Sequence, residues 1–284
     1  MVMERTFFSN RATYVGDVSI HVTNLNNSLD FYQNIIGFHI LERNERKVVL
    51  TADGKTSLLT LEEPEKVLSK QVKTTGLYHF ALLLPTRADL ASFLMHCLQQ
   101  NVQLGASDHL VSEALYLSDP DGNGIEVYSD RLSSAWEWIN NQVTMATEPL
   151  EGEGLLAELK SPWMYLPNKT VMGHIHLHVA HLEEAKQFYV EGLGFNVVSN
   201  YPGALFISTA NYHHHIGLNI WNGEGAPAPE NNSVGLKLFT LVYPDKQTLD
   251  DAIDRLKASE VKIKEENNGY LVEDPSKNLI HLRK

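Results

Sequence analysis

The sequence predicts an α+β protein built from four copies of one module, in which a strand and a helix precede three further strands. A repeated segment indicates the duplication. A Phe-Tyr pair and a Gly-Phe pair stand six residues apart at Phe31–Gly37 and again at Phe188–Gly194. Two Asp-Pro turns, at 119–123 and 274–278, form a second repeated feature. Motifs that recur in similar segments mark one structural unit used more than once.

The first module, about residues 14–64, shows the order of elements most clearly. It opens with a short strand at 18–22, and the apolar side chains at 29, 32, 35 and 36 then recur with a helical period. Gly37 ends this helix as a C-terminal glycine. Three strand-like stretches complete the module, at residues 38–41, 47–51 and 56–61.

The other three modules repeat this order. In the second, a strand at 78–84 precedes a helix that opens at Pro85 and runs to about Gln100. The turn at 119–124 then joins two strands, because it is dense in turn-forming residues. The helix of the fourth module is expected at 246–257. The second, third and fourth modules cover about residues 76–131, 172–224 and 235–284.

The modules form two halves separated by a connection. We expect an N-terminal half at 1–131, a linker at 132–171 and a C-terminal half at 172–284. The linker holds several proline, glycine and serine residues, a composition typical of a connection. A length of 284 residues is enough for two domains, each with its own core.

Composition excludes several classes of partner. Hydrophobic residues make up 43% and charged residues 20%, which is typical of a globular protein. A net charge of −12 argues against nucleic acid and anionic membranes. The chain has no apolar run long enough to span a bilayer, and we expect no signal peptide, because Met1–Arg5 has no basic segment followed by an apolar one. The single cysteine, Cys97, fits a reducing compartment, so we expect a cytoplasmic protein.

This arrangement of modules resembles the vicinal oxygen chelate superfamily, which includes glyoxalase I, bleomycin-resistance proteins and type I extradiol dioxygenases. The resemblance covers nearly the whole chain outside the linker. It implies that the modules pair into two half-open β-barrels. It also implies a metal ion held by side chains from the first and last strands of the paired modules.

Aligning the four modules reduces thirteen histidines to a short list. The position of the family's first-strand ligand is occupied by Asp17, His79, His174 and Leu238 in modules one to four. The last-strand position holds Glu126 in the second module and His281 in the fourth, with Asn219 in the third and Thr60 or Leu61 in the first.

Only the pairing of modules two and three gives two histidines and one carboxylate: His79, His174 and Glu126. This donor set with open positions is the signature of non-haem Fe(II) oxygen chemistry. We therefore expect modules two and three to share one site, and modules one and four to form a site without a complete ligand set. His176 lies on the same strand face as His174, so strand alternation by itself leaves it as an alternative ligand.

The segment from His109 to Glu126 supplies further candidates. It contains a histidine, an aliphatic-Tyr pair ending at Tyr116, an Asp-Pro turn with glycine, and then the ligand glutamate. This order is similar to the extradiol dioxygenase signature, which implies that His109 exchanges protons with a bound catechol and that Tyr116 orients it. His215, four residues before Asn219 on the same side of a strand, competes with His109 for the acid–base role.

The resemblance and the donor set together predict an Fe(II)-dependent extradiol dioxygenase that opens catechol-like rings with O2. Mn(II) shares this coordination geometry, so the sequence does not separate the two metals. The expected partners are a small aromatic diol and O2, and the sequence leaves open whether the chain forms a homo-oligomer. A hydroquinone dioxygenase, a glyoxalase-type metalloenzyme and a non-catalytic binding or resistance protein remain as alternatives.

Overall fold

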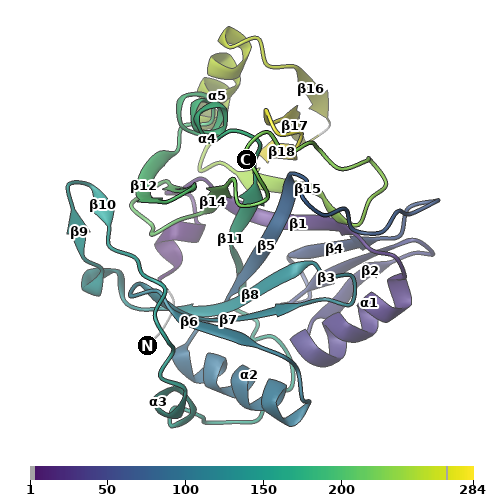
Figure 1. Ribbon diagram of the computed structural model, residues 1–284, viewed down its shortest axis with the longest axis vertical. Helices are drawn as coiled ribbons and strands as arrows, with labels where there is room; N and C mark the ends of the chain where they lie inside the picture. Colours follow the sequence, from purple (N-terminus) through teal and green to yellow (C-terminus); the bar gives the residue numbers. More distant parts are fainter. Residues whose placement is uncertain (1–3, 267) are drawn as a thin grey trace.

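Two curled eight-stranded sheets form the body of the protein (Figure 1). The computed structural model describes residues 4–266 and 268–284. The expectation about a signal peptide therefore falls partly outside the described residues, because it concerns residues 1–3. Together with the helices on their flanks, the two sheets confirm the predicted α+β class and the two half-open barrels.

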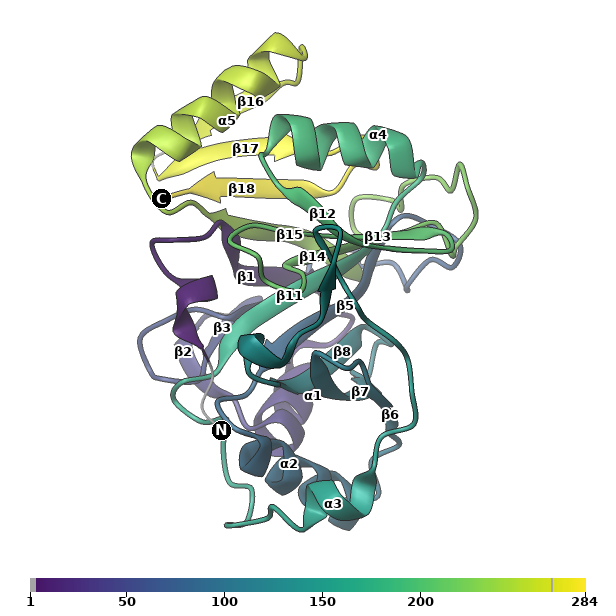
Figure 2. The same cartoon turned by 90° about the vertical axis from the view of Figure 1, so that its left-hand side faces the viewer.

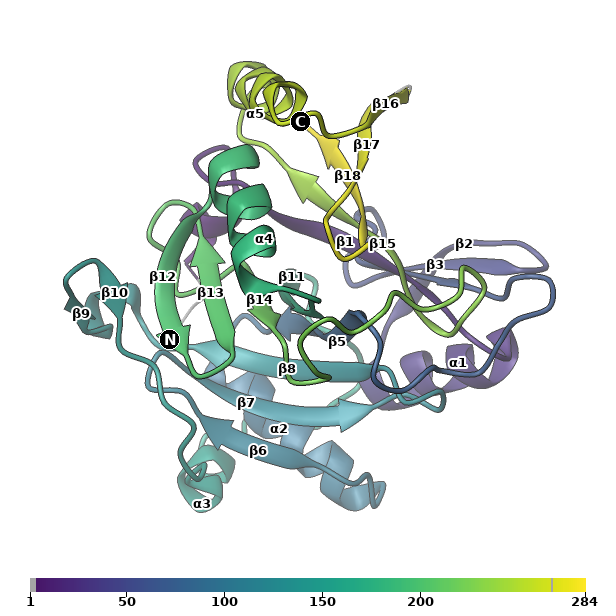
Figure 3. The same ribbon diagram turned by 45° about the horizontal axis from the view of Figure 1, so that its top comes forward.

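The first sheet combines modules two and three in the order β12-β13-β14-β11-β5-β8-β7-β6, and Figure 3 shows its curl. Its strands are β5 (Gly76–Leu83), β6 (Gly105–Asp108), β7 (Ser112–Ser118), β8 (Gly124–Asp130), β11 (Val171–His178), β12 (Asn196–Tyr201), β13 (Ala204–Ser208) and β14 (Ile216–Asn219).

The second sheet combines modules one and four in the order β16-β17-β18-β15-β1-β4-β3-β2. Its strands are β1 (Tyr14–His21), β2 (His39–Arg43), β3 (Lys47–Thr51), β4 (Leu59–Glu62), β15 (Gly235–Val242), β16 (Ile263–Glu266), β17 (Gly269–Glu273) and β18 (Leu279–Arg283). Each sheet therefore takes one module from each half of the chain, and the predicted pairing of module two with module three is confirmed.

The helices lie at the two ends of the molecule, with α4 and α5 at one end and α1 and α2 at the other (Figure 2). Their bounds are α1 (Leu25–Phe31), α2 (Arg87–Gln99), α3 (Gly152–Leu156), α4 (Leu182–Lys186) and α5 (Lys246–Ala258). The linker also contains a short hairpin of β9 (Trp138–Ile139) and β10 (Gln142–Val143). Among the described residues, no helix is long and apolar enough to cross a membrane.

In each half of the chain, the tyrosine of the repeated Phe-Tyr motif forms a hydrogen bond to the neighbouring module. The Tyr32 hydroxyl donates a 3.0 Å hydrogen bond to Asp119, the first residue of the Asp-Pro turn in the next module. Tyr189 donates a 2.9 Å bond to Asp274 in the same way. The Phe-Tyr pair and the Asp-Pro turn, which both recur in the sequence, therefore supply the donor and the acceptor of one buried hydrogen bond in each half of the chain.

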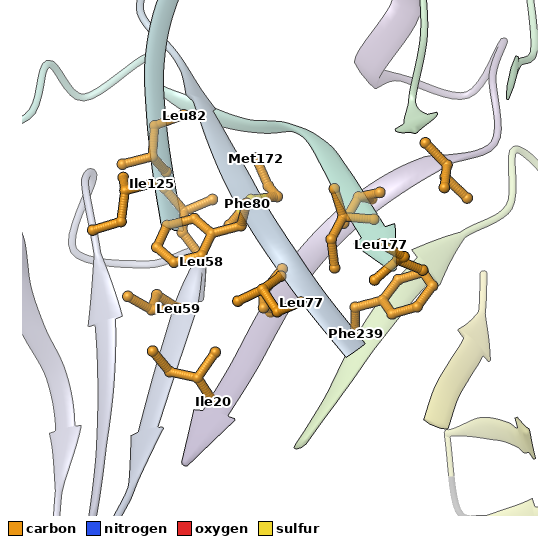
Figure 4. Close-up of a cluster of buried hydrophobic side chains, with 14 of the residues drawn as sticks. Ile20, Leu58, Leu59, Leu77, Phe80, Leu82, Ile125, Met172, Leu177 and Phe239 are labelled. Atoms are coloured by element: carbon orange, nitrogen blue, oxygen red, sulfur yellow. The ribbon is translucent and has the colours of Figure 1, made fainter. Parts of the chain in front are cut away.

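The two sheets pack against each other through one apolar core (Figure 4). Phe80 and Leu177 come from the first sheet, and Ile20 and Phe239 come from the second. All four side chains are fully buried, and burial of a large apolar side chain contributes about 1.5–3 kcal/mol. Because alternate strand residues face opposite ways, the histidines of β5 and β11 point to the other face of their sheet.

Candidate metal centre

Three donor atoms from three neighbouring strands meet on the concave face of the first sheet. His79 lies on β5, Glu126 on β8 and His174 on β11. The Nε2 atoms of His79 and His174 lie 3.0 and 3.1 Å from Oε2 of Glu126, and 3.3 Å from each other. All three side chains are buried. Among the described residues, this is the one cluster of three potential ligands that is tight enough to hold a metal ion.

The spacing of the donor atoms fits ligation of one ion on one face. With metal–ligand bonds of ~2.1 Å, donors at right angles lie ~3.0 Å apart and tetrahedral donors ~3.4 Å apart. The separations of 3.0, 3.1 and 3.3 Å lie between these values, nearer on average to the right-angled arrangement. Such an arrangement leaves the opposite face of the ion open.

Electrostatics keep two of the donors, Glu126 and His174, in the protonation states that a metal requires. Burial would raise the pKa of Glu126, but the imidazoles of His174 and His79 beside it hold that pKa well below its usual range. Burial also lowers the pKa of His174 to about 4. The carboxylate is therefore ionised and His174 neutral near neutral pH, and metal binding needs both forms.

The third module offers no fourth ligand, and here the structure corrects the sequence alignment. In β5, the residue two after His79 is Ala81, which pairs with Glu126. In β11, the residue two after His174 is His176, which pairs with Gly217. Gly217, and not Asn219, is therefore the counterpart of Glu126. The lateral register of parallel strands decides this position, and the third module lacks the Asp-Pro turn that fixed it in modules two and four.

Gly217 leaves room for a neighbouring ring. A Cβ atom at this position would lie 2.8 Å from the imidazole of His176. His176 is buried against this glycine and lies outside the donor cluster, so the structure favours His174 over His176 as the ligand. Asn219 instead accepts a 2.7 Å hydrogen bond from His178.

His109 and Tyr116 lie together at the same cavity. Nε2 of His109 is 2.5 Å from the Tyr116 hydroxyl, and its Nδ1 is 2.6 Å from the carbonyl oxygen of Ala146. Because a carbonyl only accepts, Nδ1–H donates to Ala146 and Nε2 accepts from Tyr116. Burial and the nearby charge of Glu126 raise the pKa of Tyr116 well above its usual range, so its hydroxyl stays protonated.

His215 does not line the cavity, contrary to the sequence prediction. Its Nε2–H donates to the carbonyl of Phe7 at 3.0 Å, and its Nδ1 accepts from the Thr209 amide at 3.3 Å. The rings of Phe8 and Tyr212 lie against it. Strand alternation predicts the face of the sheet on which the His215 side chain lies, but not whether the side chain reaches the cavity. The N-terminal segment covers it, since Phe7 and Phe8 both contact its ring.

His214 occupies the position that was predicted for His215. It lines the cavity, and its ring centroid is 4.1 Å from that of His174. Ala210 and Asn211 have φ angles of 56° and 59°, so the chain turns sharply just before the three histidines. His214 lies before β14 begins at Ile216, so strand alternation does not predict where its side chain points. The run of three histidines was visible in the sequence, but the sequence did not show which of the three faces the cavity.

The cavity around these residues measures about 410 Å³. Three partly exposed aromatic rings stand among its lining residues: Tyr78, Tyr201 and Trp221. His79, Glu126 and His174 line the same cavity, together with His109, Tyr116 and His214. Its size is in the range of small-molecule sites.

Comparison with known proteins identifies the family. The model of the Glyoxalase/Bleomycin resistance protein/Dioxygenase superfamily matches residues 14–127 and 171–282. Catechol-2,3-dioxygenase of Bacillus subtilis (strain 168) is 47% identical over 268 residues, which cover 93% of this chain and 94% of that protein. The chain belongs to the Glyoxalase/Bleomycin resistance protein/Dioxygenase superfamily.

More distant relatives agree with this assignment. Biphenyl-2,3-diol 1,2-dioxygenase 3 of Rhodococcus globerulus is 27% identical over 110 residues, covering 38% of this chain and 58% of that protein. The crystal structure of glyoxalase I from Zea mays superposes with a TM-score of 0.59 at 14% identity, covering 95% of this chain and 92% of that one. At this identity the likeness shows a shared fold and nothing more.

Proposed function

We propose that this chain is an Fe(II)-dependent extradiol dioxygenase that opens catechol-like rings with O2, cutting beside the paired hydroxyls. The observation that carries the proposal is the cluster of two imidazoles and one carboxylate, His79, His174 and Glu126, on one side of an open cavity. Non-haem Fe(II) oxygenases use this donor set. The 47% identical relative, named Catechol-2,3-dioxygenase, supports the same activity.

The protein would supply the metal ligands, and the metal would bind both reactants. When bound, Fe(II) would act as a template and a Lewis acid for a catecholate and O2. His79, Glu126 and His174 would hold it from one side. Because Gly217 brings no fourth donor, the side toward the cavity stays free for a substrate that binds through two oxygens.

Two groups of this chain are placed to handle the substrate's protons. His214 has one ring nitrogen bonded to His213, at 2.8 Å, and its ring lines the cavity beside His174. We assign it the role of the base that takes a hydroxyl proton at Nε2. Both nitrogens of His109 already have partners, so His109 orients Tyr116 by accepting its hydroxyl hydrogen, and the Tyr116 oxygen is then free to accept a hydrogen bond from a substrate hydroxyl.

The corrected register weakens the glyoxalase-type alternative. A four-ligand site of that kind needs a second side-chain donor from the third module, at the position opposite Glu126. Glycine occupies it, and a glycine has no side-chain donor at all. A non-catalytic binding protein would not need three buried side chains that converge as metal ligands.

Anaerobic reconstitution with Fe(II), followed by catechol and then air, tests the proposal. We expect stoichiometric iron, O2 uptake and a yellow ring-fission product, because cutting beside the hydroxyls leaves a conjugated semialdehyde. Glu126→Gln should lose both iron and activity. The matched control is His281→Ala, which alters the equivalent position of the other sheet and should keep both. Iron binding without O2 uptake on any catechol or hydroquinone would overturn the proposal.

A further inference from the structure

A buried chain of hydrogen bonds leads from the end of β8 to the cavity. Oδ1 of Asp130 lies 2.8 Å from Nε2 of His213, and Nδ1 of His213 lies 2.8 Å from Nδ1 of His214. The His213 side chain is fully buried, and that of Asp130 is 10% exposed. Water therefore does not compete for these bonds, which makes their directions well defined.

When both imidazoles are neutral, the chemistry of the donors fixes the direction of each bond. An ionised carboxylate only accepts, so Nε2 of His213 carries the hydrogen that Asp130 binds. A neutral imidazole has one N–H, so Nδ1 of His213 is an acceptor. It can accept only from Nδ1–H of His214. His214 then carries its hydrogen on Nδ1 and a lone pair on Nε2, an assignment that follows from the network.

The second oxygen of Asp130 is also engaged, which holds the carboxylate in place. Oδ2 accepts from the Tyr212 hydroxyl at 3.0 Å, and the Tyr212 oxygen lies 2.7 Å from the Tyr128 hydroxyl. The Tyr128 ring packs 5.1 Å from the ring of His174. Asp130 is thus bonded to two groups of the 209–215 segment and cannot turn toward one without releasing the other.

The chain of bonds joins two modules. Asp130 belongs to β8 of the second module, whereas His213 and His214 belong to the third. Neither Asp130 nor His213 lines the cavity, so neither can touch a substrate there. In the part of the chain that the structure describes, His214 has no protein hydrogen bond at Nε2. The network therefore acts on whatever enters the cavity only through His214.

We propose that Asp130 and His213 are positioning residues that hold His214 in the Nδ1–H tautomer, with its Nε2 lone pair free to accept a proton from the substrate. This inference rests on the function proposed above. It adds a carboxylate–imidazole–imidazole relay assembled only when modules two and three pair. No net proton transfer along the relay is needed: the substrate proton moves to Nε2 of His214, which becomes an imidazolium that Asp130 stabilises through His213.

Asp130→Asn is the decisive variant because it keeps the shape and removes the charge. An amide NH₂ facing His213 would donate to Nε2 and move the His213 hydrogen to Nδ1. His214 would then have to accept at Nδ1 and carry its hydrogen on Nε2, the tautomer that cannot take a proton there. A wrong tautomer of the base removes general-base catalysis, so we expect kcat to fall about 100-fold or more. KM and iron content should stay unchanged.

A direct readout on the metal-free protein separates this inference from the proposed function. Long-range ¹H–¹⁵N spectra report which ring nitrogen carries the hydrogen, and the His214 signals are assigned by their loss in His214→Gln. We expect Nδ1–H in the unaltered protein and Nε2–H in Asp130→Asn. Asp254→Asn, a charge change at a side chain that is 78% exposed, is the control and should alter neither spectrum nor kcat.

Several outcomes would overturn the relay. One is an Nε2–H tautomer of His214 in the unaltered protein. Another is an Asp130→Asn enzyme with unchanged kcat, or one whose activity falls only because iron is lost while the tautomer is kept. His213→Phe gives a second measurement, since removal of the acceptor should lower kcat with retained iron. If the unaltered enzyme opens no catechol, the proposed function fails, while the tautomer spectra still decide whether the relay exists.

Discussion

Replacing His174 by alanine removes one of three donor atoms that lie 3.0–3.3 Å apart. This should reduce the amount by which Fe(II) raises the melting temperature, Tm. A metal ion that binds only the folded chain stabilises it by an amount that depends on its concentration relative to Kd. The useful quantity is the difference in Tm with and without Fe(II). Any packing loss from the deleted ring is present in both measurements and cancels.

The expected size follows from the number of donors. Loss of an outer-shell partner alone weakens metal binding 10–100-fold, so loss of one of three direct ligands should weaken it ~100-fold or more. At 1,000 times the Kd of the unaltered protein, Fe(II) contributes about 4.1 kcal/mol, and a 100-fold weaker site about 1.4 kcal/mol. The difference of about 2.7 kcal/mol corresponds to roughly 5–10 °C in Tm.

The assay is anaerobic thermal unfolding with and without Fe(II). It compares the unaltered protein with His174→Ala and His281→Ala. His281 lies on β18 of the other sheet and pairs with Thr240 as Glu126 pairs with Ala81, so it is the matched control. Its variant should keep the full increment from Fe(II). Equal increments for all three proteins would refute the ligand assignment, and equal losses in both variants would refute the placement of one site in the first sheet.

Three further predictions concern packing and reactivity. Gly217→Ala should lower the free energy of unfolding in urea by about 1–3 kcal/mol, because the new methyl group meets the His176 ring; an unchanged midpoint would contradict the close contact. Tyr32→Phe should cost about 1–3 kcal/mol by removing one of the two donors to Oδ2 of buried Asp119, and equal stability would show that this bond does not hold the modules together. Burial raises the pKa of the Cys97 thiol to about 12, so iodoacetamide at pH 8 should label it only after unfolding, as mass spectrometry can check.

The positions of the three candidate ligands along their own strands could be predicted because strand geometry is local and periodic. Side chains alternate along a strand, and the Phe-Tyr and Asp-Pro motifs mark the same points in different modules. Aligning those points brought His79, His174 and Glu126 to corresponding positions, and the structure places their donor atoms together. The pairing of modules two and three also followed, because only that pair had a complete ligand set.

Two assignments in the third module failed for one physical reason. Asn219 was placed opposite Glu126, and His215 was placed in the cavity, by extending strand alternation through a segment that lacks a marker motif. β14 begins only at Ile216, so His214 lies in the irregular segment before the strand, where alternation does not apply, and it is His214 that lines the cavity. Sideways pairing between strands decides that Gly217 is the true counterpart, and no local pattern in the sequence encodes that pairing.

The sequence by itself predicted the class of fold, the pairing of modules two and three, and the three side chains that the structure brings together, because each prediction depends on short-range periodicity and on repeated motifs. Only the tertiary structure decided which histidine of 213–215 reaches the cavity, how Asp130 connects to it, and that Gly217 stands in the third module where Glu126 stands in the second. These features depend on contacts between modules that are more than eighty residues apart, where loop conformation and lateral strand register fix the geometry.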